Sequence, residues 1–111
     1  MNYRPLRVSK LIKEELGELL LKNLEFPGVL VTITDVNVSS KLDIARVELS
    51  VLPVDATKKV FKAVNAAQKE LQYLLLKKIN IKPMPQIMFE VDHGAENAAK
   101  VEKLLIQDNN K

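Results

Sequence analysis

Apolar residues recur every three or four positions near the start of the chain. Over residues 5–24 they share one side, whereas the charged residues fall on the other; the apolar set is Val8, Leu11, Ile12, Leu16, Leu19 and Leu20. This spacing predicts an amphipathic helix. Pro5 suits a first helical turn, and Phe26-Pro27-Gly28 is expected to end the helix.

Two segments that follow have the pattern of strands. Residues 29–38 are rich in β-branched types, but their apolar parity slips near Thr34-Asp35, which predicts a β-bulge. Residues 44–52 alternate cleanly, with one inward set: Ala45, Val47, Leu49 and Val51. The link over residues 39–43 is short enough for a hairpin, so we expect the two strands to pair antiparallel.

A long helix is predicted over residues 57–79, with Asp55 or Thr57 as its N-terminal cap. Its apolar stripe consists of Val60, Val64, Ala67, Leu71, Leu74 and Leu75. Such a helix would be about 35 Å long, whereas strands of this size span about 25–30 Å. The good helix formers from Ala66 to Glu70 favour a continuous helix. The difference in length favours a bend near Ala67-Gln68-Lys69, and we expect the bend.

The prolines of Lys82-Pro83-Met84-Pro85 interrupt the chain, and Ile87, Phe89 and Val91 then alternate as a third strand. A last helix is expected over residues 95–107, with an inward face made of Ala98, Val101, Leu104 and Leu105. The element order α-β-β-α-β-α predicts an α+β fold, in which helices pack on one face of a three-stranded sheet. We expect one domain over residues 1–106, a flexible polar tail over 107–111, and a core that includes Val47, Leu49, Leu71 and Phe89.

Composition narrows the compartment and the chemistry. Cysteine is absent, so disulfides and thiolate metal ligands are excluded. No stretch approaches the roughly 20 apolar residues of a membrane span, and we expect a cytoplasmic protein. The only histidine, His93, is expected in a turn at a strand end, and no phosphate-loop or nucleophile motif appears. We therefore expect no enzyme, no metal and no cofactor.

Positive charge is concentrated in one segment of the chain. The net charge is only +3, but residues 56–85 hold seven lysines and one glutamate. These lysines are Lys58, Lys59, Lys62, Lys69, Lys77, Lys78 and Lys82. They suit contacts with nucleic-acid phosphates, and they equally suit a solvated helix face. Arg4, Arg7 and Lys10 could extend the same basic patch. Only Tyr3 and Tyr73 are candidates for base stacking, because we expect the phenylalanines in the core.

Several segments, in matching order, resemble the ribosome-binding factor A family over about residues 4–106. Arg4-Pro5-Leu6-Arg7-Val8 resembles its R-x-x-R-V opening. Residues 31–39, followed by Leu42, Ala45, Val47, Val51 and Leu52, resemble its hairpin core, and residues 83–89 with Asp92 resemble its third strand. Ala67-Gln68-Lys69 stands where the family has an Ala-x-Gly kink, so Lys69 replaces the glycine.

The resemblance implies a type II KH-like domain that binds small-subunit ribosomal RNA and assists late maturation of the subunit. It also implies a monomer, cold sensitivity and a ribosome-maturation GTPase as a later partner. The expected RNA-binding set is Arg4, Arg7, Lys10, Lys58, Lys59, Lys62, Gln68, Lys69, Lys77 and Lys78. The alternative is a protein–protein interaction module without direct RNA contact, in which the lysines confer only solubility.

Overall fold

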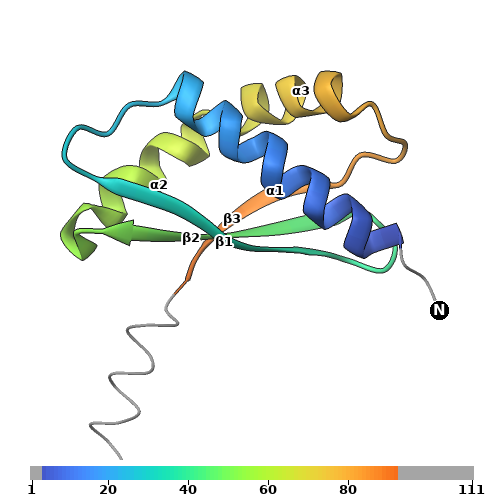
Figure 1. Cartoon of the computed structure of the whole chain (residues 1–111), viewed down its shortest axis with the longest axis horizontal. Coiled ribbons are helices and arrows are strands. Elements are labelled where there is room, and N and C mark those ends of the chain that lie inside the picture. The colour runs from blue at the N-terminus through green and yellow to red at the C-terminus, as the bar shows by residue number, and fades with distance from the viewer. Residues whose placement is uncertain (1–3, 93–111) are drawn as a thin grey trace, which may run out of the picture.

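The computed structural model describes residues 4–92, and its elements follow the expected order (Figure 1). A short 3₁₀ turn, Val54–Ala56, follows the second strand. The helices and strands are α1 (Arg4–Asn23), β1 (Leu30–Val38), β2 (Ile44–Leu52), α2 (Thr57–Ala66), α3 (Gln68–Ile79) and β3 (Gln86–Val91). The helix predicted over residues 95–107, the polar tail, Tyr3 and His93 lie outside the described residues.

The three strands form one sheet in the order β1-β2-β3. β1 pairs antiparallel with β2, as the short link predicted, and β2 pairs parallel with β3. The register of the first pair shifts between Ile33 and Asp35, so the predicted bulge is confirmed, with Thr34 as the extra residue. The sheet therefore has two outer edges, one along β1 and one along β3.

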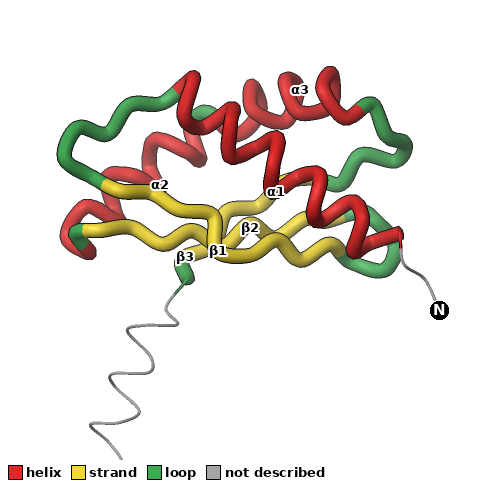
Figure 2. The backbone as a smooth tube through the Cα atoms, viewed as in Figure 1, coloured by secondary structure: helices red, strands yellow, loops and turns green. Residues whose placement is uncertain are grey.

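All three helices lie on the same face of the sheet (Figure 2), so the predicted α+β layout is confirmed. Val47, Leu49 and Leu71 are buried in the core as expected, whereas Phe89 is only half-buried against it. Leu11 is 41% exposed, so its assignment to the inward face of the first helix was wrong. The buried hydrophobic residues are Val8, Ile12, Leu16, Leu19, Val36, Leu42, Ala45, Val47, Leu49, Val51, Val60, Val64, Leu71, Leu75 and Ile87.

The predicted long helix is broken at one residue. Ala67 separates α2 from α3 with φ −90° and ψ 0°, and the two helices run in different directions (Figure 1). The Ala67 N–H still donates to the Ala63 carbonyl at 3.0 Å, and the Leu71 N–H donates to the Ala67 carbonyl at 2.9 Å. The expected bend is therefore confirmed, and it is made without a glycine.

The predicted cap of α2 was wrong. Ala56 occupies the N-cap position, and no side chain caps the helix there. The Thr57 hydroxyl instead donates to the Val54 carbonyl at 2.6 Å, which ties the helix start to the preceding turn.

Candidate nucleic-acid interface

A row of exposed lysines follows the outer side of the broken helix. Lys58 and Lys62 are four positions apart in α2, the spacing of one helix face, and Lys69 is exposed in the first turn of α3, beyond the break. We call these three lysines the lysine row. Val60 and Val64 are buried on the opposite side of α2, so packing of α2 on the sheet turns the row toward solvent. Lys59 is also exposed beside it.

The break at Ala67 falls inside the lysine row. α3 begins at Gln68, so the positive end of its dipole lies between Lys62 and Lys69. Glu70, in the same first turn, contributes a negative charge close by. The bend thus places Lys62 and Lys69 near the start of α3, although the negative C-terminal end of α2 meets the same break and offsets the dipole of α3.

Two glutamines attach α3 to the outer edge of β3. The Gln72 amide accepts a hydrogen bond from the Ile87 N–H at 2.8 Å and donates one to the Pro85 carbonyl at 2.7 Å. Gln68 donates to the Ile87 carbonyl at 3.0 Å. These amides satisfy strand groups that a further strand would otherwise bind. Gln68 is half-buried by this contact, so the structure gives it a structural partner.

The arginines of the first helix do not extend the lysine row. Figure 1 shows the start of α1 and α2 near opposite ends of the molecule. The Arg4 guanidinium donates to the Lys82 carbonyl at 2.7 Å, which places it beside the loop between α3 and β3. Arg4 therefore lies beside Lys82, a member of the same basic segment, and not beside the lysine row. Arg7 and Lys10 are exposed with Arg4 at a second basic site, separate from the row.

The profile of the family described as ribosome-binding factor A matches residues 4–105. The chain belongs to that family. The ribosome-binding factor A of Staphylococcus carnosus is 36% identical over 107 residues, which are 92% of this chain and 90% of that protein. This membership confirms the family resemblance of the sequence.

Two structural comparisons support the fold. The crystal structure of ribosome-binding factor A from Thermus thermophilus is similar at a TM-score of 0.67 and 19% identity, covering 78% of this chain and 94% of that one. A homology model of the Thermus thermophilus factor, fitted into a cryo-EM map of its 30S complex, has a TM-score of 0.64 and 20% identity, covering 76% and 90%. The predicted KH-like fold is consistent with this family.

The two lysines at the end of α3 have partners within the described chain. Lys77 Nζ lies 4.8 Å from the centre of the Tyr73 ring, a cation–π contact on the surface. Lys78 Nζ lies 3.2 Å from a Glu15 carboxylate oxygen and 3.1 Å from one of Glu18, and so joins α3 to α1. The hydrogen bonds that Lys78 donates to Glu18 and then to Glu15 raise the pKa of Lys78. A phosphate at Lys78 would have to compete with these carboxylates.

The raised pKa of Lys78 predicts a pH dependence of stability. The stabilisation is fully present below the ordinary lysine pKa of 10.5 and is lost as the pH rises through the higher folded value. The wild type should therefore lose more stability than Lys78→Met as the pH rises from 9.5 to above 10.5. Urea unfolding across this range measures it, with Lys22→Met, which changes an exposed lysine of α1, as the control. Parallel curves for wild type and Lys78→Met would show that the bridge does not contribute.

The glutamine contacts predict a second effect on stability. Gln72→Ala removes the partners of the Ile87 N–H and the Pro85 carbonyl, and each half-buried group left unpaired is costly. We expect a loss of about 1–3 kcal/mol in the free energy of unfolding, measured by urea denaturation. The control is Gln86→Ala, which removes an exposed glutamine at the start of β3 and should lower the free energy of unfolding by less than about 0.5 kcal/mol. Equal costs for the two variants would contradict the bonded role of Gln72.

Acidic side chains form no metal site within residues 4–92, where no group of three His, Cys, Asp or Glu residues comes together. No helix in that part of the chain is both long and apolar enough to cross a membrane.

Proposed function

We propose that this protein binds the ribosomal RNA of the small subunit and assists the late maturation of that subunit. The observation that carries the proposal is the family match over residues 4–105, which includes every described element. The Thermus thermophilus factor fitted into a 30S complex supports the small subunit as the partner. Action in the cytoplasm as a monomer, with a maturation GTPase as a later partner, belongs to the same proposal.

The lysine row supplies the RNA contact in this proposal. It spans twelve residues, from Lys58 to Lys69, which corresponds to about 16 Å of helix and is long enough to follow several phosphates along one strand. Phosphates neutralised by lysine release their counterions, so the affinity depends on RNA charge and not on base sequence. α3 begins at Gln68, beside Lys69 at one end of the row.

Recognition of shape and backbone is proposed in preference to base reading. Along the outer edge of β3, the Ile87 N–H and carbonyl already bind Gln72 and Gln68. Tyr73 is 56% exposed and has Lys77 over its ring, so one face is already occupied by a cation. Within residues 4–92, Phe26, Phe61 and Phe89 are half-buried against the core, so they are poorer platforms for stacking than an exposed ring.

A salt titration tests the proposal against a protein-interaction module. Wild-type protein would be bound to purified small subunits, to the isolated small-subunit rRNA and to large subunits at several KCl concentrations. We expect tighter binding to small than to large subunits, and a logarithm of the affinity for rRNA that falls linearly with log salt concentration. Binding to subunits without binding to isolated rRNA, and with little dependence on salt, would favour the protein-interaction alternative.

A further inference from the structure

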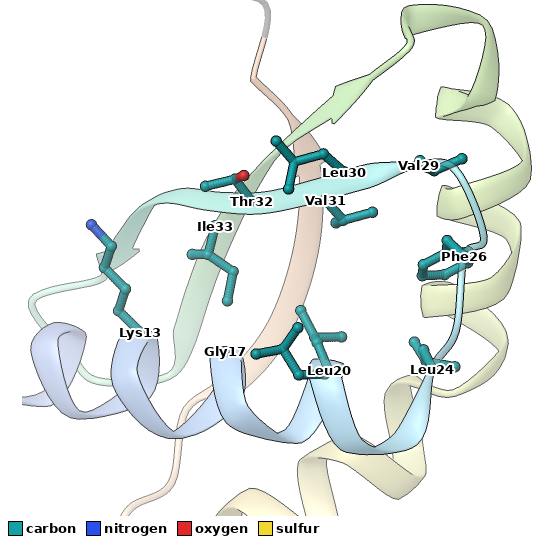
Figure 3. Close-up of a pocket in the computed structure, with 11 residues that line it drawn as sticks. Lys13, Gly17, Leu20, Leu24, Phe26, Val29, Leu30, Val31, Thr32 and Ile33 are labelled. Carbon is teal, nitrogen blue, oxygen red and sulfur yellow. The ribbon is translucent and has the colours of Figure 1, made fainter.

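An apolar groove lies between the second half of α1 and the edge strand β1. It encloses about 460 Å³, and its walls are mainly apolar: Leu20, Leu24, Phe26, Val29, Val31 and Ile33. Figure 3 shows Leu20, Val31 and Ile33 directed into the space between helix and strand. Lys13 lies at one end of the groove. The groove is distinct from the lysine row, because none of the residues that line it belongs to that row.

The groove leaves core-facing side chains of β1 incompletely covered. Val47 and Leu49 of the central strand are 0% exposed, whereas Val31 and Ile33, on the same face of the neighbouring strand, are only partly buried. β1 is also an outer strand, paired only with β2. Proteins generally cover apolar surface beside an open strand edge, because such an edge can pair with other chains.

Gly17 is a second feature of the groove that needs an explanation. It stands in the middle of α1, where glycine weakens a helix relative to alanine. A Cβ added there would meet no atom within 4 Å, so the described residues do not require glycine at this point. A missing side chain does allow another backbone to approach closely. Gly17 is therefore explained if a further segment packs over it.

We propose that residues 95–107 of this same chain form a helix that docks in the groove. Its expected apolar face pairs a small residue, Ala98, with the larger Val101 and Leu105 at helical spacing, which suits a groove with a glycine notch. A helix of 13 residues is marginal in water by itself, so its stability has to come from packing. The groove offers the apolar surface that this packing needs.

The end of β3 places this segment within reach. Val91 is in register with Leu49, and Leu49 is in register with Ile33 in the groove wall. Two strand spacings, about 10 Å, separate Val91 from Ile33. The chain from Asp92 to Ala98 spans up to about 20 Å when extended, and Gly94 within it permits a sharp turn.

The bare face of the sheet is a poorer site for the same helix. The register turns Asp35, Glu48 and Glu90 toward it together with Arg46, whose Nε lies 3.8 Å from a Glu90 carboxylate oxygen. An apolar helix face laid there would remove these charges from water, and the Arg46–Glu90 pair would compensate only two of the four. The groove imposes no such cost on the apolar stripe.

Amide chemical shifts of the full chain test where the segment docks. In Val101→Glu/Leu105→Glu, which places charge on the proposed contact face, we expect shifts at Gly17, Leu20 and Val31. Gln107→Glu/Asn110→Glu adds the same charge away from the apolar stripe and should leave the groove signals in place. Changes confined to residues 93–111, or centred on Arg46 and Met88 of the bare face, would overturn the proposal.

A double-mutant comparison tests the docking independently of the chemical shifts. If the groove is filled, Gly17→Ala should lower the urea midpoint of the otherwise wild-type chain, because the added methyl group meets the docked helix. The same change in the Val101→Glu/Leu105→Glu background should raise the midpoint, since alanine then only improves α1. A raised midpoint in both backgrounds would mean that the groove is empty.

Sedimentation of the wild type over a range of concentrations separates docking within one chain from pairing between chains. We expect a monomer throughout; a dimer lost in Val101→Glu/Leu105→Glu would assign the groove to a second copy and overturn the proposal. None of these measurements uses RNA. A negative result would therefore not contradict the proposed function, and a failure to bind RNA would not contradict the docking of residues 95–107.

Discussion

Replacing Lys58, Lys62 and Lys69 together by glutamine should weaken RNA binding and make it less sensitive to salt. Each phosphate contact contributes about 0.7–0.9 to the slope of log affinity against log salt, so losing three contacts should reduce the slope by about 2–3. The affinity loss should be largest at low salt. Binding to small-subunit rRNA at five or more KCl concentrations measures both quantities.

The matched control removes the same charge from elsewhere. Lys13, Lys22 and Lys41 are exposed and lie outside α2 and α3, so their triple glutamine variant has the same net charge. It should change the slope by well under half as much as the first variant. Equal slopes for the two variants would assign the effect to net charge. An unchanged slope in the lysine-row variant would move the site to the other basic end, where Arg7→Gln/Lys10→Gln would be tested next.

The strands could be predicted from the sequence because their pattern is local. Alternation over residues 44–52 has period two, and the residues assigned inward, from Ala45 to Val51, are all buried. The slip in parity near Thr34 was enough to locate the bulge. The assignment of Leu11 to the buried face failed, because helical spacing places a residue on one face of the helix but does not determine how far the sheet extends beneath that face.

The bend shows a geometric argument succeeding where residue preference failed. Alanine, glutamine, lysine and glutamate around Ala67 all favour continuous helix. The sheet is too short for a straight helix of that length. The bend allows Val60 and Val64 before the break and Leu71 after it all to be buried, and this burial favours bending. Tertiary packing thus outweighs the local preference, and Lys69 is accommodated without glycine.

The arrangement of the basic residues could not be predicted, because it depends on where the helices pack. Sequence order alone does not reveal that α1 begins far from α2 and beside Lys82, so it could not show which lysines the arginines join (Figure 1). The contacts of Gln68 and Gln72 were also missed. A signal was present: the two are four residues apart, and each stands three residues before a buried leucine, Leu71 or Leu75, where an unpaired amide would be costly.

Leu71→Ala should cost roughly 2–5 kcal/mol in the free energy of unfolding. Leu71 is 1% exposed and belongs to the same core as Val64, Leu75 and Val47. Alanine would remove the outer atoms of the side chain and leave a cavity, since close-packed neighbours relax only in part. Urea unfolding followed by circular dichroism measures the change, and the slope against urea should stay near the wild-type value.

Leu76→Ala is the matched control, because it makes the same chemical change in the same helix. Leu76 is 38% exposed, so its truncation removes fewer contacts and should cost less than about 1 kcal/mol. The difference between the two variants isolates packing from helix propensity, which changes equally in both. A cost below about 1 kcal/mol for Leu71→Ala would mean that α3 does not pack through this face. The position of Lys69, two residues earlier, would then have to be revised with it, because the same helix register that buries Leu71 exposes Lys69 to solvent.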